Sequence, residues 1–182
     1  RIAEREDAFL DEELARHNLT GDKLGLAGFS QGAMMALHVG MRRKVLPAAI
    51  VGFSGMLVGP EKLPKLQKPP PVLLLHGDAD NVVPPGALFM SATALGAAGV
   101  PVQWHLAKAL GHGIAPQGLA LAGRFIHDAF SGRAVRAGPV AAGRDGESPH
   151  RPARAGPAMA DRRRGKFRAD RDRGPDHRLQ RR

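Results

Sequence analysis

The alternation of short, largely apolar runs with segments of helical periodicity in residues 1–130 constrains the fold most. Runs that stay apolar, rather than alternating with polar residues, are typical of parallel sheets covered on both faces. We expect four such strands, over residues 24–29, 48–53, 72–75 and 102–106. The segments around them predict helices over residues 3–17, 31–43, 86–98 and 116–130. Strands that alternate with helices predict an α/β fold with a mainly parallel sheet.

Residues 131–182 have a different composition. Residues 1–130 carry 12 Lys and Arg against 11 Asp and Glu, whereas the last 52 residues carry 15 basic and 6 acidic side chains. Apart from Ala, this segment has five apolar residues, which follow no helical or strand period: Val135, Val140, Met159, Phe167 and Leu179. So little apolar surface does not offset the entropy of ordering the chain. We therefore expect a partial domain over 1–130 and a disordered Arg/Ala/Gly/Pro-rich tail over 131–182.

The tail has two interpretations. The first, which its composition favours, is a solvated segment without a fixed partner. The second is a noncatalytic module in which the basic tail binds nucleic acid or another polyanion. Binding of single strands by stacking needs aromatic side chains, and the tail contains only Phe167. We therefore do not expect nucleic acid to be the partner.

Two absences in the sequence exclude several classes of protein. The chain has no Cys, which excludes disulfides, thiolate metal sites and a Cys nucleophile. No apolar run approaches the ~20 residues of a membrane helix. Residues 1–7 are charged where a signal peptide would become apolar. We therefore expect no membrane span and a cytoplasmic protein.

The first strand end that carries chemistry is Gly28-Phe29-Ser30-Gln31-Gly32. It follows a predicted strand and precedes a predicted helix, the context of a G-x-S-x-G nucleophile elbow. Ser30 would occupy a tight, strained turn that projects its hydroxyl from the sheet. We expect Gly28 and Gly32 to flank it because side chains there would collide with the neighbouring strand and helix. The backbone amide of Gln31, at the helix start, is then a candidate donor to an oxyanion.

The second strand end, residues 76–84, contains two candidate carboxylates, Asp78 and Asp80. A base needs such a carboxylate to fix its tautomer and to stabilise its protonated form. Spacing alone does not choose between the two.

The third strand end is Gly111-His112-Gly113-Ile114. Glycine on both sides lets the imidazole of His112 enter a site. The order Ser, Asp, His along the chain is the one expected of α/β hydrolases. A second Gly-Phe-Ser occurs at residues 52–54, but Met56 stands where the elbow needs glycine, so we interpret Ser54 as a loop residue.

Together these motifs resemble one family. Residues 20–130 are similar to the carboxyl-terminal part of the phospholipase/carboxylesterase family of α/β hydrolases, which includes bacterial carboxylesterases and acyl-protein thioesterases. The matching residues are Gly-Phe-Ser-Gln-Gly at 28–32, Gly-Phe-Ser-Gly at 52–55, His-Gly-Asp-Ala-Asp-Asn-Val-Val-Pro at 76–84 and Gly-His-Gly-Ile at 111–114. The resemblance implies an α/β-hydrolase fold with Ser30 as nucleophile, Asp80 as acid and His112 as base.

The chain departs from the family before the elbow. Members carry several strands there, with an early His-Gly loop that donates a second N–H to the oxyanion. This chain has one predicted helix before Ser30 and no His-Gly-x-Gly sequence. We therefore expect a sheet whose amino-terminal strands are missing. Because losing one oxyanion donor typically costs ~10²–10³ in turnover, we also expect a serine carboxylesterase that is impaired or inactive.

The implied reaction is hydrolysis of a small-molecule ester or thioester through an acyl-enzyme. This chemistry needs no metal or organic cofactor. Met34 and Met56 are candidates for contact with an acyl chain, although the helical spacing of Met34 favours a plain core position.

Overall fold

The computed structural model describes residues 2–133 and 137–140. Its sheet is parallel throughout and follows chain order, β1-β2-β3-β4-β5. The strands are β1 (Gly25–Phe29), β2 (Ala49–Phe53), β3 (Val72–Gly77), β4 (Val102–Ala107) and β5 (Gly138–Pro139). The helices are α1 (Ile2–Arg16), α2 (Gln31–Gly40), α3 (Gly86–Ala97) and α4 (Pro116–Phe130), with short 3-10 turns η1 (Gly21–Lys23) and η2 (Pro60–Lys62). The predicted α/β fold with a mainly parallel sheet is confirmed.

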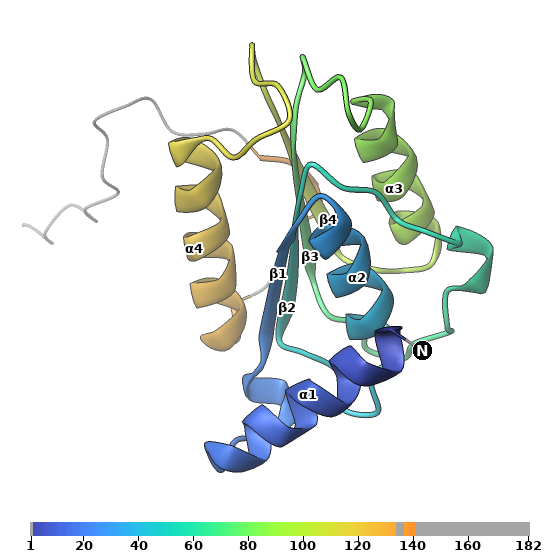
Figure 1. The fold of residues 1–182 in the computed structure, drawn as a ribbon, viewed down its shortest axis with the longest axis vertical. Coiled ribbons are helices and arrows are strands. Elements are labelled where there is room, and N and C mark those ends of the chain that lie inside the picture. Colours follow the sequence, from blue (N-terminus) through green and yellow to red (C-terminus); the bar gives the residue numbers. More distant parts are fainter. Residues whose placement is uncertain (1, 134–136, 141–182) are drawn as a thin grey trace, which may run out of the picture. The chain divides into compact units, whose positions relative to one another are not determined.

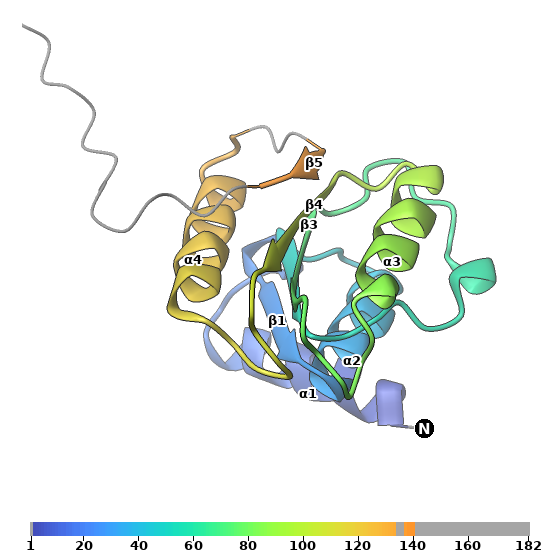
Figure 2. The same ribbon diagram turned by 90° about the horizontal axis from the view of Figure 1, so that it is seen from above.

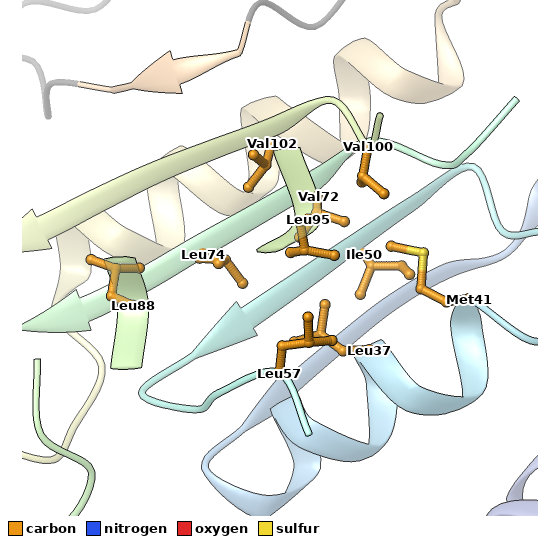
Figure 3. Close-up of a cluster of buried hydrophobic side chains, with 10 residues drawn as sticks. All are labelled: Leu37, Met41, Ile50, Leu57, Val72, Leu74, Leu88, Leu95, Val100 and Val102. Carbon is orange, nitrogen blue, oxygen red and sulfur yellow. The ribbon is translucent and has the colours of Figure 1, made fainter. Parts of the chain in front are cut away.

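Helices cover both faces of the sheet, with α2 and α3 on one face and α4 on the other (Figure 1). Every residue of β2 and β3 is buried, which explains why these strands are apolar or glycine except for His76. Successive side chains of a strand point to opposite faces, so β2 serves two cores: Ile50 packs toward α2 and α3, and Val51 toward α4. Figure 3 shows the first of these cores, formed by Leu37, Met41, Ile50, Leu57, Val72, Leu74, Leu88, Leu95, Val100 and Val102.

Helix α1 lies where a helix was predicted over residues 3–17. It has no buried residue, and Phe9 is 54% exposed. Ion pairs link α1 to the end of α2: the guanidinium of Arg43, just past α2, pairs with the carboxylates of Asp7 and Asp11. None of the described helices is both long and apolar enough to cross a membrane.

The short strand β5 has no counterpart among the predicted elements. It lies beside β4, with Gly138 opposite Gln103 and Pro139 opposite Trp104 (Figure 2). The N–H of Val140 donates to the carbonyl of Trp104 at 2.8 Å. Residues 131–182 were expected to be disordered, and this expectation is wrong for β5, because pairing with β4 orders it. Residues 134–136 and 141–182 of the expected tail lie outside the described residues, so the boundary at residue 130 stays a prediction.

The carboxyl ends of the strands lie along one edge of the sheet, at the top of Figure 1. Three candidate segments begin there: residue 30 after β1, residues 78–84 after β3 and residues 108–115 after β4. Ligands of open parallel sheets bind at this edge. In the strand order of the described sheet, β1 is the outermost strand at the end opposite β5.

Candidate active site

The turn between β1 and α2 holds Ser30 in a conformation that few side chains adopt. Its backbone has φ 53° and ψ −118°, outside the ordinary regions for a residue other than glycine. The N–H of Ser30 donates to the carbonyl of Phe53 at 2.8 Å, which fixes the turn to the neighbouring strand. Strain of this kind persists only where surrounding structure enforces it, and it is concentrated at functional sites.

The glycines on either side of Ser30, Gly28 and Gly32, differ in how much room a side chain would have. A Cβ on Gly28 would lie 2.1 Å from the carbonyl oxygen of Gly32, so the predicted collision is right for Gly28. A Cβ on Gly32 would meet nothing within 4 Å in the described part of the chain, so the predicted collision is wrong there. The backbone of Gly32, not space for its side chain, is what lies against β1.

The imidazole of His112 lies between the serine and a carboxylate. Its Nε2 is 3.0 Å from Ser30 Oγ, and its Nδ1 is 2.8 Å from Asp80 Oδ2. The side chain is 18% exposed, and its ring packs against Phe29 with centroids 4.8 Å apart. The structure thus brings together Ser30, His112 and Asp80, the three residues for which the resemblance implied a joint role.

Asp80 is fully buried and held on both oxygens. Its Oδ1 accepts the backbone N–H groups of Val82 and Val83, each at 2.9 Å. Burial by itself raises the pKa of a carboxyl group. Here the hydrogen bonds from His112, Val83 and Val82 outweigh burial and hold the pKa of Asp80 below its ordinary value of 3.8. The group is therefore an acceptor for the His112 N–H at neutral pH.

Asp78, the other carboxylate left open by spacing, makes a different contact. Its Oδ1 accepts the backbone N–H of Ala109 at 2.6 Å, in the loop that leads to His112. The end of β3 approaches this loop closely, since a Cβ on Gly77 would lie 2.0 Å from the carbonyl oxygen of Leu110. Asp78 therefore fastens the histidine loop to the acid loop.

Ser54, in the second Gly-Phe-Ser, is buried directly after β2. Its hydroxyl donates to the carbonyl of Gly113 at 3.3 Å, so it supports the loop beyond His112. Next to it, a Cβ on Gly55 would lie 2.9 Å from the carbonyl oxygen of Ser30. This loop therefore packs against the elbow.

One residue of the site was missed by sequence reasoning. The sequence analysis assigns no role to His76, yet its Nε2 lies 3.3 Å from Asp80 Oδ2 and 2.8 Å from the carbonyl oxygen of Val83. The sequence feature that could have indicated this contact is the spacing of four residues between His76, at the end of β3, and Asp80.

The first turn of α2 places backbone N–H groups next to Ser30. Gln31 is the first residue of the helix, where N–H groups have no partner within the helix and the dipole favours negative charge. This is the position that the sequence assigned to an oxyanion donor. In the described part of the chain, no group of three or more His, Asp or Glu side chains could hold a metal ion.

A large apolar groove lies between the loop after β2 and helix α3. Its volume is about 680 Å³. Its walls include Met56, Leu57, Val58 and Pro60 from the loop and Phe89, Met90 and Ala94 from α3. Met56, a candidate for contact with an acyl chain, lines this groove, whereas Met34 is not among its wall residues.

Several known proteins are similar to this chain. Acyl-protein thioesterase 1 of Gibberella zeae is 31% identical over 104 residues, which is 54% of this chain and 44% of that protein. Acyl-protein thioesterase 1 of Schizosaccharomyces pombe is 35% identical over 89 residues, 47% of this chain and 38% of that protein. The chain thus spans about half the length of these relatives, or less.

Solved structures agree in fold. Esterase PE8 is 42% identical, with a TM-score of 0.64 over 67% of this chain and 57% of its own. Zea mays acyl-protein thioesterase 2 is 28% identical, with a TM-score of 0.58 over 70% of this chain and 64% of its own. The expected α/β-hydrolase fold is therefore confirmed.

Residues 1–129 match the family described as Phospholipase/Carboxylesterase. The chain belongs to the phospholipase/carboxylesterase family of α/β hydrolases.

Proposed function

We propose that this chain carries the serine-hydrolase centre of a carboxylesterase or acyl-thioesterase, with Ser30 as nucleophile, His112 as general base and Asp80 as orienting acid. The observation that carries the proposal is the continuous chain of contacts from Ser30 Oγ to His112 Nε2 at 3.0 Å and from His112 Nδ1 to Asp80 Oδ2 at 2.8 Å. A serine hydroxyl is a weak nucleophile unless an adjacent base removes its proton, and these contacts are of hydrogen-bond length.

The reaction has two halves. Ser30 Oγ attacks the carbonyl carbon while its proton moves to His112 Nε2, giving a tetrahedral intermediate. The carbon–oxygen or carbon–sulfur bond to the leaving group then breaks, and the leaving group takes the proton from His112. Water attacks the resulting acyl-serine with its proton moving to His112, and the acid product departs as Ser30 regains that proton. Asp80 stays ionised throughout and stabilises the imidazolium.

The developing oxyanion needs donors that are in place before reaction. Gln31 N–H, at the first residue of α2, is the donor that we assign from the described residues. With this one donor assigned, we expect turnover lower by about 10²–10³ than in a site with a complete oxyanion hole.

The apolar groove along α3 supports a substrate with an apolar acyl part. The relatives named acyl-protein thioesterases and esterases point to the same substrate class, acyl esters or thioesters. Met56, which lines the groove, directly follows Gly55, which lies against the carbonyl of Ser30.

The test is hydrolysis of p-nitrophenyl esters of short and long acyl chains. We expect turnover that rises with acyl length and that is abolished in Ser30→Ala. Ser131→Ala, a change at an exposed serine at the end of α4, is the matched control and should hydrolyse like the wild type. Substantial hydrolysis by a folded Ser30→Ala variant would refute the assignment.

A further inference from the structure

The side chain of His76 is 1% exposed at the end of β3, and it lies behind the candidate acid. Its Nε2 is 2.8 Å from the carbonyl oxygen of Val83 and 3.3 Å from Asp80 Oδ2. Both oxygens only accept hydrogen bonds, because Asp80 is ionised. Nε2 of His76 must therefore carry a proton, and this N–H donates to the carbonyl of Val83.

This contact closes a loop of interactions around the acid. The N–H of Val83 donates to Asp80 Oδ1, while the carbonyl of the same residue accepts from His76. Asp80 Oδ2 in turn accepts the N–H of His112 and lies 3.3 Å from Nε2 of His76. The carboxylate is thus fixed in rotation by donors on both oxygens. One of these donors, Val83, is itself bonded through its carbonyl to His76 of β3.

We propose that His76, held as its Nε2–H tautomer, is a positioning residue that sets the orientation of Asp80 toward His112. It contacts neither Ser30 nor the expected substrate position, and it acts through the carboxylate and the carbonyl of Val83. The proposal rests on the proposed function in one respect, that Asp80 orients the base of a serine hydrolase.

A pair of amide substitutions separates this role from simple packing. His76→Gln places an amide nitrogen near the position of Nε2, whereas His76→Asn carries the same amide one methylene shorter and does not reach Val83. The matched control is His105→Gln. His105 lies on the neighbouring strand β4 and also bonds a backbone carbonyl, that of Val140 at 2.7 Å, without contacting Asp80.

The first measurement is the rate at which a fluorophosphonate probe labels Ser30. We expect labelling about tenfold slower in His76→Asn, the rate equivalent of one lost hydrogen bond. His76→Gln should restore the rate to within about threefold of the wild type. His105→Gln should label at the wild-type rate. Equal losses in the Gln and Asn variants at equal stability, or no loss in either, would overturn the proposal.

The second measurement does not depend on activity. Long-range ¹H–¹⁵N correlation NMR of the wild type should show His76 protonated on Nε2 and not on Nδ1. The proton between His112 and Asp80 should move downfield in His76→Asn and stay in place in His76→Gln, because Oδ2 loses the nearby N–H, 3.3 Å away, only in the former. An Nδ1–H tautomer, or a proton signal unmoved in His76→Asn, would overturn the role of His76. Failure of the wild type to label at Ser30 would instead refute the proposed function.

Discussion

Replacing Gly28 by alanine should damage both the fold and the elbow. The new Cβ would lie 2.1 Å from the carbonyl oxygen of Gly32 and 2.6 Å from the N of Ala33. The first of these distances is about 0.9 Å inside 3.0 Å, the closest approach that real Cβ atoms show. Both clashing atoms are backbone, so no side chain can rotate away and β1 and α2 must separate.

The magnitude follows from the kind of contact. Overpacking of a core typically costs about 1–3 kcal/mol, and a clash with backbone atoms, which no side-chain rotation relieves, belongs at or above the upper end. We therefore expect Gly28→Ala to lower the free energy of unfolding by about 3 kcal/mol. The remaining folded protein should label slowly with a fluorophosphonate, because the displaced helix carries Ser30 and Gln31 away from His112.

The structure provides two controls of the same chemistry. Gly52 pairs with Gly28 across β1 and β2, but a Cβ there would meet Ala33 and Leu74 side chains at 3.4 Å, an ordinary contact. Gly32→Ala meets nothing within 4 Å and adds a better helix former, which favours folding by up to about 1 kcal/mol.

The assay is urea unfolding followed by far-UV circular dichroism, with probe labelling of each variant. A Gly28→Ala protein within about 0.5 kcal/mol of the wild type, an ordinary surface effect, would refute the steric reasoning for the elbow.

Three further predictions concern the charged groups. Asp80→Asn should reduce turnover by up to about 10⁴-fold with little change in fold, since an amide favours the wrong tautomer of His112; unchanged ester hydrolysis would contradict this. Because the pKa of Asp80 is lowered in the folded state, its contribution to stability is complete above pH 3.8 and is lost as the pH falls through the folded-state pKa. Urea midpoints of wild type and Asp80→Asn should therefore converge only below about pH 4, and convergence at higher pH would show that the pKa is not lowered. Finally, the side chain of Arg43 is 3% exposed and pairs with Asp7 and Asp11. Removing both carboxylates should therefore lower the free energy of unfolding more than Arg43→Met does, with a difference of about 1–2 kcal/mol in urea unfolding. The reverse order would show that the buried charge is not the costly element.

Most of the sheet was predictable because burial on both faces leaves a direct trace in the sequence. Residues 49–53 and 72–77 are apolar or glycine almost throughout, and the structure buries every one. By contrast, β5 consists of Gly138 and Pro139, which have no strand propensity. Its pairing depends on the position of β4 and not on local sequence. The exposure of Phe9 on α1 likewise depends on what packs beside it, which periodicity does not reveal.

The sequence predicted which residue types form the site and their order along the chain, but it did not predict which side chains contact one another. Strand ends and glycine neighbours singled out Ser30 and His112, because parallel strands deliver their following residues to one edge. Spacing did not separate Asp78 from Asp80, since both lie in one turn and only side-chain direction distinguishes them. The same limit applies to Gly32, where the expected collision does not occur, and to His76, whose contact with Asp80 depends on how the chain turns after β3.

The central claim is that Ser30, His112 and Asp80 form a working nucleophile within this chain. The most direct measurement is to incubate the full chain with a fluorophosphonate, beside Ser30→Ala, and to map the adduct by mass spectrometry. The account predicts one adduct, on Ser30, that is absent from the Ser30→Ala variant. A folded chain that shows no adduct, or an adduct that persists in Ser30→Ala, would contradict it.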